Sequence, residues 1–212
     1  MEGDIAPLPE LVRLCDKYGV FLMIDDAHGL GVLGENGSGT ASHFGLTNDV
    51  DLIMGTFSKS FGSLGGFIAG DKEVINFIKH TSRSLIFSAS MTPASVAAAS
   101  RALDIMIEEP ERRENLWKVT RHAHKLFREA GFDIGRTETP IIPLFVRDTI
   151  KAMTIVRMAY ERGVFITPVI APAVPENDVL IRFALMATHS TAQVDEAVEK
   201  LTGIFREVGV IA

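Results

Sequence analysis

The chain has 212 residues, of which 47% are hydrophobic, and a formal net charge of −6 at pH 7. This apolar content is enough to bury a sizeable core, and the acidic balance without a Lys/Arg-rich arm argues against nucleic-acid binding. No apolar stretch approaches the roughly 18 to 20 residues that span a bilayer, and no signal-like segment opens the chain, so we expect a cytoplasmic protein.

The first half of the chain alternates apolar helices and strands. Residues 1–8 lead directly into a helix with no strand before it, so we expect the chain to begin within a domain. Helices are predicted at 9–18, 72–82 and 93–107, and strands at 20–24, 50–54 and 67–69. Near-continuous apolar strands alternating with helices predict an α/β layered domain whose sheet is parallel in large part.

The pattern of predicted helices and strands changes in the second half of the chain. Pro110, with Glu108, Glu109 and Glu111, marks a break in the pattern. Beyond it, helices are predicted at 111–130, 149–162 and 191–207, and strands at 141–146, 164–168 and 180–186. A few strands with helices on one side predict a small α+β domain. We therefore expect two domains, residues 1–109 and 110–212.

Two polar motifs follow apolar strands in the first domain. Asp25-Asp26-Ala27-His28 comes after the first strand, and Gly55-Thr56-Phe57-Ser58-Lys59-Ser60-Phe61-Gly62 comes after the second. Ligands of open α/β sheets bind at the carboxyl ends of the strands. We therefore expect both motifs to serve one site.

Lys59 is the candidate nucleophile. A neutral lysine amine forms Schiff bases with carbonyl compounds. A solvated surface charge is the alternative for any single lysine, but the small and hydroxyl residues around Lys59 leave room for a cofactor and supply hydrogen-bond donors. The pattern is typical of lysines that hold pyridoxal phosphate.

Three further residues suit the same cofactor. A buried Asp25 carboxylate would keep a pyridine nitrogen protonated so that the ring accepts electrons; a turn aspartate is the alternative, and Asp26 could be only that. His28 could reach the phenolic oxygen of the cofactor. Asp25 and His28 could also be metal ligands, but without a third ligand nearby we expect no metal. Thr56 could place its hydroxyl on the phosphate or the ring oxygen.

Arg182 is a charged residue inside the apolar run at 180–186. A guanidinium binds a carboxylate through two parallel hydrogen bonds, which suits recognition of an amino acid substrate. A structural ion pair is the alternative, and the sequence leaves both open.

With these residues in place, the chain resembles the α-oxoamine synthase family of fold-type I pyridoxal phosphate enzymes. The resemblance covers all 212 residues but only the carboxyl-terminal half or so of a family member. It implies the aspartate aminotransferase-like fold, here the end of the large domain followed by a small domain. It also implies that Asp25, His28, Thr56 and Lys59 bind the cofactor and that Arg182 binds the carboxylate of the substrate.

The resemblance further implies a reaction and an assembly. The segment 87–91 is similar to the stretch that reaches the cofactor phosphate of a neighbouring subunit, which makes Ser88 a candidate phosphate ligand. Family members are dimers with sites at the subunit interface, so we expect a homodimer. Peripheral membrane association stays open.

The serine before Lys59 makes the motif most similar to that of the serine palmitoyltransferases. This implies decarboxylative condensation of L-serine with palmitoyl-CoA to 3-ketodihydrosphingosine, a sphingolipid precursor, with Lys59 removing the α-proton. The alternatives are a sister synthase, such as a 2-amino-3-ketobutyrate CoA ligase or 8-amino-7-oxononanoate synthase, a non-catalytic subunit of the same fold, or an inactive fragment.

Overall fold

The computed structural model describes residues 1–212, which form two compact units. The first unit comprises Ala6–Arg113, and the second comprises Met1–Ile5 with Glu114–Ala212. The sequence places the boundary between residues 109 and 110. In the structure, helix α6 (Pro110–Glu129) starts at that point and continues, so the units divide within its first turns.

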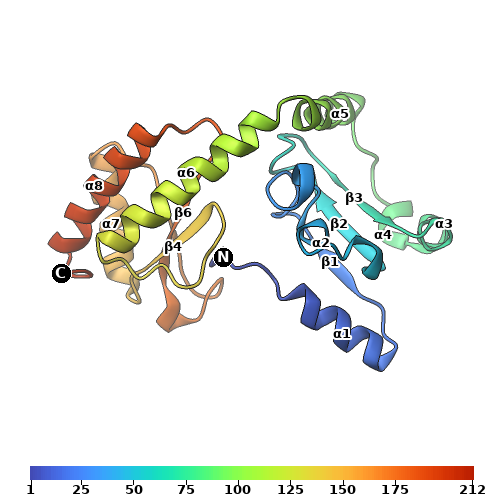
Figure 1. The fold of residues 1–212 in the computed structure, drawn as a ribbon, viewed down its shortest axis with the longest axis horizontal. Helices are drawn as coiled ribbons and strands as arrows, with labels where there is room; N and C mark the ends of the chain where they lie inside the picture. The colour runs from blue at the N-terminus through green and yellow to red at the C-terminus, as the bar shows by residue number, and fades with distance from the viewer. The chain divides into compact units, whose positions relative to one another are not determined.

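The first unit is built on a three-stranded sheet in the order β1-β2-β3 (Figure 1). Strand β1 (Met23–Asp25) pairs in parallel with β2 (Leu52–Thr56), and β2 pairs antiparallel with β3 (Gly66–Gly70). The sheet is therefore mixed: the expected parallel pairing holds for β1 and β2, whereas β3 is antiparallel. The loop between β2 and β3 is too short for the crossover that a parallel pair needs, so β3 folds back beside β2 as a hairpin.

Helix α1 (Leu8–Tyr18) covers one face of this sheet. Its buried residues Leu8 and Val12 pack with Ala41 and Val50 in one apolar cluster, against which the partly buried Ile24 and Ile53 of the strands also pack. The helix ends at Gly19, whose left-handed backbone (φ 61°) lets the N–H of Val20 donate to the carbonyl of Cys15. Residue 20 thus belongs to the end of the helix, which shortens the strand predicted from it.

The rest of the first unit consists of helices and the loops that connect them. Short helix α2 (Thr40–His43) lies between β1 and β2, and α3 (Lys72–Thr81), α4 (Arg83–Ile86) and α5 (Pro93–Glu108) follow β3. Single 3-10 turns occupy Glu35–Gly37 and Thr47–Asp49.

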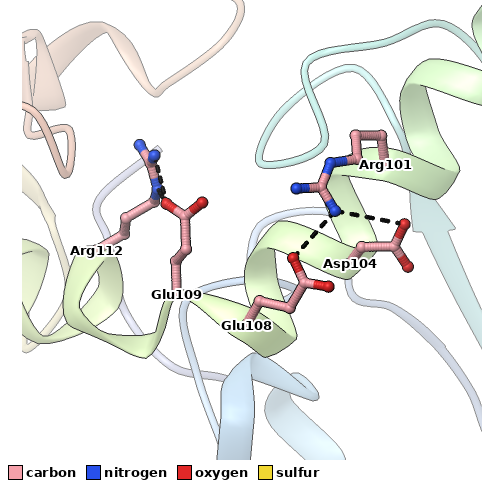
Figure 2. Close-up of polar contacts among 5 residues, drawn as sticks. All are labelled: Arg101, Asp104, Glu108, Glu109 and Arg112. Atoms are coloured by element: carbon pink, nitrogen blue, oxygen red, sulfur yellow. Dashed lines mark hydrogen bonds and ion pairs between the residues drawn. The ribbon is translucent and has the colours of Figure 1, made fainter.

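The acidic break at the end of α5 is partly neutralised by local arginines (Figure 2). Arg101 lies 3.0 Å from Glu108 and 3.8 Å from Asp104, and Arg112 pairs with Glu109. All of these side chains are largely exposed except Glu109, so each pair contributes at most about 1 kcal/mol. They offset the clustered negative charge where one helix ends and the next begins.

The second unit contains an antiparallel sheet in the order β4-β6-β5. Its strands are β4 (Ile141–Phe145), β5 (Thr167–Val169) and β6 (Leu180–Ala184), accompanied by α6, α7 (Thr149–Glu161), α8 (Thr191–Glu207) and a 3-10 turn at Glu176–Asp178. Buried aromatic rings form part of its core, with centroids 4.7 to 5.0 Å apart for the pairs among Phe127, Phe132, Phe183 and Phe205.

The segment Met1–Ile5 is fastened to this second unit. The carbonyl of Gly3 accepts hydrogen bonds from the hydroxyls of Thr137 (3.1 Å) and Thr139 (2.8 Å). Gly3 has φ 75°, and a Cβ added there would lie 2.1 Å from the carbonyl oxygen of Ile141. The position therefore requires glycine. No helix in either unit combines the length and apolar character needed to cross a bilayer.

Candidate active site

The two polar motifs meet at one edge of the β1-β2-β3 sheet. Asp25 is the last residue of β1 and Thr56 the last residue of β2, and the parallel register pairs Asp25 with Met54. Parallel strands have their carboxyl ends at the same edge of a sheet. His28 and Lys59 each follow three residues beyond these strand ends, on the loops that leave this edge.

Asp25 is exposed and its carboxylate is oriented locally. Its Oδ1 accepts the N–H of Ala27 at 3.0 Å. The expectation of a buried carboxylate at Asp25 is wrong in this structure, because the buried acid is its neighbour Asp26, at 3% exposure. Successive residues at a strand end point to opposite sides, so only one of the two can face the core.

Asp26 is a structural residue. Its carboxylate accepts hydrogen bonds from the N–H and the hydroxyl of Thr40, and its carbonyl accepts the N–H groups of Gly29 and Leu30. Burial raises the pKa of Asp26, although the Thr40 hydrogen bonds act in the opposite direction. This residue fixes the turn that carries the exposed His28.

Lys59 lies on a loop closed at its base by backbone hydrogen bonds. The N–H of Phe57 donates to Gly65 at 2.9 Å, and the N–H of Ser63 donates to Phe57 at 2.7 Å. At the apex, the N–H of Gly62 donates to the carbonyl of Lys59 at 2.9 Å. The Lys59 side chain is exposed and takes no part in the hydrogen bonds that build the loop. The amine is therefore available to a ligand.

Thr56 and Ser58 form a hydroxyl pair that the sequence motif did not reveal. Their oxygens lie 2.8 Å apart, and the Thr56 hydroxyl also donates to the carbonyl of Gly65 at 3.2 Å. Since the Thr56 proton is directed to Gly65, the Ser58 hydroxyl is the donor within the pair. Thr56 is thus an oriented acceptor at the strand end, and to bind the phosphate or the ring oxygen, as predicted, its hydroxyl proton would have to turn from Gly65 to that ligand.

Sequence reasoning also missed the fold of the loop at residues 26–39. The feature of the sequence that could have revealed this fold is the close spacing of the glycines in the loop. A Cβ at either Gly29 or Gly39 would lie 2.0 Å from an Asp26 carboxylate oxygen, so only glycine allows the chain to wrap around this acid.

Arg182 lies on β6 of the second unit, where it pairs with Pro143 on one side and Thr167 on the other. The residue is half-buried, and its Nε is buried without a hydrogen-bond partner. Buried charged donors without partners are rare and costly. This nitrogen is therefore suited to an anionic ligand.

Ser88 lies just after α4 on an exposed segment of the first unit, and its N–H donates weakly to Leu85 at 3.4 Å. Its role as a phosphate ligand stays a prediction. The roles of the other predicted residues also stay predictions, although Asp25, His28, Thr56 and Lys59 share one sheet edge.

This edge offers a donor set that fits pyridoxal phosphate. An amine can react with the aldehyde, a carboxylate can face a pyridinium nitrogen, and an imidazole and hydroxyls can hold the ring oxygen or the phosphate. The exposed Asp25 and Lys59 leave the side chains open to a bound ring.

Comparison with known proteins assigns the family. The family model described as aminotransferase class I and II matches residues 1–201. The serine palmitoyltransferase of Sphingobacterium spiritivorum is 59% identical over 210 residues, which are 99% of this chain and 53% of that protein. The 8-amino-7-oxononanoate synthase of Petrotoga mobilis is 44% identical over 211 residues, which are 100% of this chain and 54% of that protein.

Solved structures agree with the sequence matches. A high-resolution structure of SPT (serine palmitoyltransferase) with a PLP internal aldimine is similar with a TM-score of 0.95 at 32% identity. The match covers 100% of this chain and 54% of that one, so the chain spans about half the length of the relatives it matches. The chain therefore belongs to the aminotransferase class I and II family, in which it is a relative of the α-oxoamine synthases.

Proposed function

We propose that the chain provides the lysine-bearing part of a pyridoxal phosphate-dependent C-acyltransferase. The proposed reaction condenses L-serine with palmitoyl-CoA, with loss of CoA and carbon dioxide, to give 3-ketodihydrosphingosine for sphingolipid synthesis. The observation that carries this proposal is the shared sheet edge, from which Asp25-x-x-His28 and Thr56-x-x-Lys59 emerge in the same three-residue spacing.

Each of these residues has a defined task in the proposal. Bound pyridoxal phosphate would supply an aldehyde and an electron-accepting ring. Lys59 Nζ holds the cofactor covalently, and Asp25 keeps a proton on the pyridine nitrogen. His28 and Thr56 orient the ring oxygen and the phosphate. The hydrogen bond from the N–H of Ala27 to Asp25 supports this role because it fixes the carboxylate before any ligand arrives.

Arg182 recognises the carboxylate of the amino acid in this proposal. Its buried, unpartnered Nε supports the role, since two parallel hydrogen bonds from the guanidinium to a carboxylate would satisfy it. Once the substrate amine has taken its place on the cofactor aldehyde, Lys59 Nζ would be free to accept the α-proton of the substrate, which requires the amine in its neutral form.

Serine and a long acyl chain are preferred over the substrates of the sister synthases. Support comes from the higher identity to a serine palmitoyltransferase (59%) than to an 8-amino-7-oxononanoate synthase (44%) and from Ser58 before the lysine. The sister activity is the second candidate because the latter match also spans the whole chain.

A cytoplasmic homodimer completes the proposal, with Ser88 of one copy near the cofactor phosphate of the other. The exposed apolar side chains beside Ser88 support a contact surface there. They are Leu85, Ile86 and Phe87, with exposures of 55%, 52% and 80%. Adjacent exposed apolar side chains are typical of protein interfaces.

A spectral titration of the full-length protein tests the function. Purified protein with pyridoxal phosphate should show a cofactor absorbance band that L-serine shifts more than glycine or alanine does. Lys59→Ala should abolish the adduct that borohydride traps, whereas Lys79→Ala, which removes another exposed lysine, should keep it. Normal turnover by Lys59→Ala would refute the proposed role, and a larger response to alanine would favour the sister synthase.

A further inference from the structure

A side-chain hydrogen bond joins the Lys59 loop to the loop that carries His28. The hydroxyl of Ser60 donates to the carbonyl of Leu30 at 2.8 Å, across 30 positions of sequence. Ser60 directly follows Lys59, and Leu30 lies two residues after His28. The contact therefore links the two parts of the candidate site through the residue next to the amine.

The two loops approach each other closely at this point. A Cβ built on Gly31 would lie 2.6 Å from the Cβ of Ser60 and 2.8 Å from its hydroxyl oxygen. Any side chain at position 31 would push Ser60 away, so glycine is required for the contact as well as for the backbone conformation there, with φ 78°.

The acceptor side of this hydrogen bond is held firmly. Leu30 is buried, its N–H donates to Asp26 at 3.1 Å, and it forms a β-bridge with Ser38. The following residue, Gly31, donates its N–H to Gly37 at 2.8 Å. The carbonyl of Leu30 is therefore a fixed anchor.

The donor side is a tight turn, which is also held by backbone hydrogen bonds, by the Ser63–Ser95 hydrogen bond and by one ring contact. Phe61 is buried and packs edge-on against Phe57, with ring centroids 5.4 Å apart. The side chains of Lys59 and Ser58 at the apex are exposed. Removal of the Ser60 hydroxyl would leave this turn free to shift relative to the loop at residues 26–39.

We infer that Ser60 is a positioning residue that sets the place of the Lys59 amine relative to Asp25 and His28. The inference rests on the proposed function, because it concerns the geometry in which the cofactor is held. Displacement of a reacting group by about 1 Å can reduce a rate by up to 100-fold. Because Ser60 acts through its neighbour, its loss should affect the chemical step more than substrate binding.

Ser60→Ala is compared with Ser63→Ala in the full-length protein loaded with pyridoxal phosphate. Ser63 is the matched control because its hydroxyl also donates to a backbone carbonyl, that of Ser95, at 2.7 Å. Its acceptor lies on α5 rather than on the loop at residues 26–39. Both variants lose one hydrogen bond of the same kind, so their melting temperatures should fall by similar amounts.

The expected difference lies in cofactor spectroscopy and kinetics. Ser60→Ala should shift the pH midpoint of the cofactor absorbance change and lower kcat about tenfold, with KM for serine changed less than about twofold. Ser63→Ala should leave the midpoint and kcat at wild-type values. Ser60→Cys, which keeps the volume but has a weaker donor, should lie between wild type and Ser60→Ala.

The outcomes separate this inference from the proposed function. If the wild-type protein forms no trapped adduct with the cofactor, the proposed function fails. If the wild-type protein loads normally, and Ser60→Ala and Ser60→Cys match Ser63→Ala in midpoint and kcat, Ser60 is merely structural and the inference is overturned. If Ser60→Ala does not fold, the midpoint and kcat of Ser60→Cys decide in the same way.

Discussion

Asp26 and Thr40 form a two-point hydrogen-bonded contact inside the first unit. The N–H of Thr40 donates to Asp26 Oδ2 at 2.7 Å, and its hydroxyl donates to Oδ1 at 2.6 Å. One residue thus engages both oxygens of a buried carboxylate. This contact anchors the loop that bears His28, whereas the adjacent Asp25 stays exposed at the sheet edge.

We predict that Thr40→Val lowers the free energy of unfolding by about 1–3 kcal/mol at neutral pH, because one buried carboxylate oxygen loses its donor. Urea denaturation measures the change. Thr47→Val, which alters an exposed threonine of the same unit, should have an effect below about 0.5 kcal/mol. Equal losses in both variants would contradict the role of the contact.

The Asp26–Thr40 contact also predicts that the loss of stability in Thr40→Val depends on pH. Burial raises the folded-state pKa of Asp26 above 3.8, so the fold favours the neutral carboxyl. That contribution is fully present below the unfolded pKa and is lost as the pH rises through the folded pKa. The ionised carboxylate depends most on its donors, so the penalty of Thr40→Val should be larger at neutral pH than near pH 4. A penalty that grows on acidification would contradict this sign.

Substitution of Arg182 should have different effects on the stability of the fold and on binding of the amino acid. Arg182→Met removes a buried Nε that has no partner, so the free energy of unfolding should stay within about 1 kcal/mol of wild type or rise. In the full-length enzyme, KM for the amino acid should rise about 100-fold, because a charge-assisted pair with the carboxylate is lost. Steady-state kinetics and urea denaturation measure the two effects.

The control for this prediction is Arg157→Met, which changes an exposed arginine of α7. It should leave both KM and the free energy of unfolding near wild type. A large loss of stability in Arg182→Met would instead indicate a structural ion pair, the alternative that the sequence left open.

Gly3→Ala should destabilise the second unit. The added Cβ would meet the carbonyl oxygen of Ile141 and lie 2.6 Å from the Thr137 hydroxyl oxygen, at a residue with φ 75°. We expect a loss of about 2–4 kcal/mol from strain and displaced hydrogen bonds. Gly131→Ala is matched in backbone conformation, with φ 84°, but has no atom within 4 Å of the new Cβ, so its loss should be about 1 kcal/mol. Equal losses would mean that the contacts of Gly3 contribute nothing.

The sequence predicted those elements whose ends carry local signals. Helix α8 matches the prediction of residues 191–207, because Ser190 and Gln193 form a capping box at its start. The strand expected at 164–168 is shifted to 167–169, since the N–H of Val164 still donates to Ala159 at the end of α7. Hydrophobicity does not distinguish a strand from the apolar residues that close a helix.

The candidate site was predictable in its position but not in its details. The spacing of Lys59 and Asp25 after apolar strands is local information, and the parallel pairing of those strands followed from it. Three details depend instead on the direction of side chains across loops. They are the exposure of Asp25 in place of Asp26, the Thr56–Ser58 pair and the Ser60–Leu30 contact. Composition and periodicity do not encode those directions.

Because β2 and β3 form a hairpin, the Lys59 loop and the strand that ends in Asp25 should form at different stages of folding. Thr56 and Gly65, which close the Lys59 loop, are nine positions apart, and loops of about ten residues close in roughly 10–100 ns. The strand that ends in Asp25 pairs with β2 only across a much longer separation, as in the pairing of Met23 with Leu52. The lysine turn can thus form early as a local event, and the acid joins it when the slower, long-range strand pairing is complete.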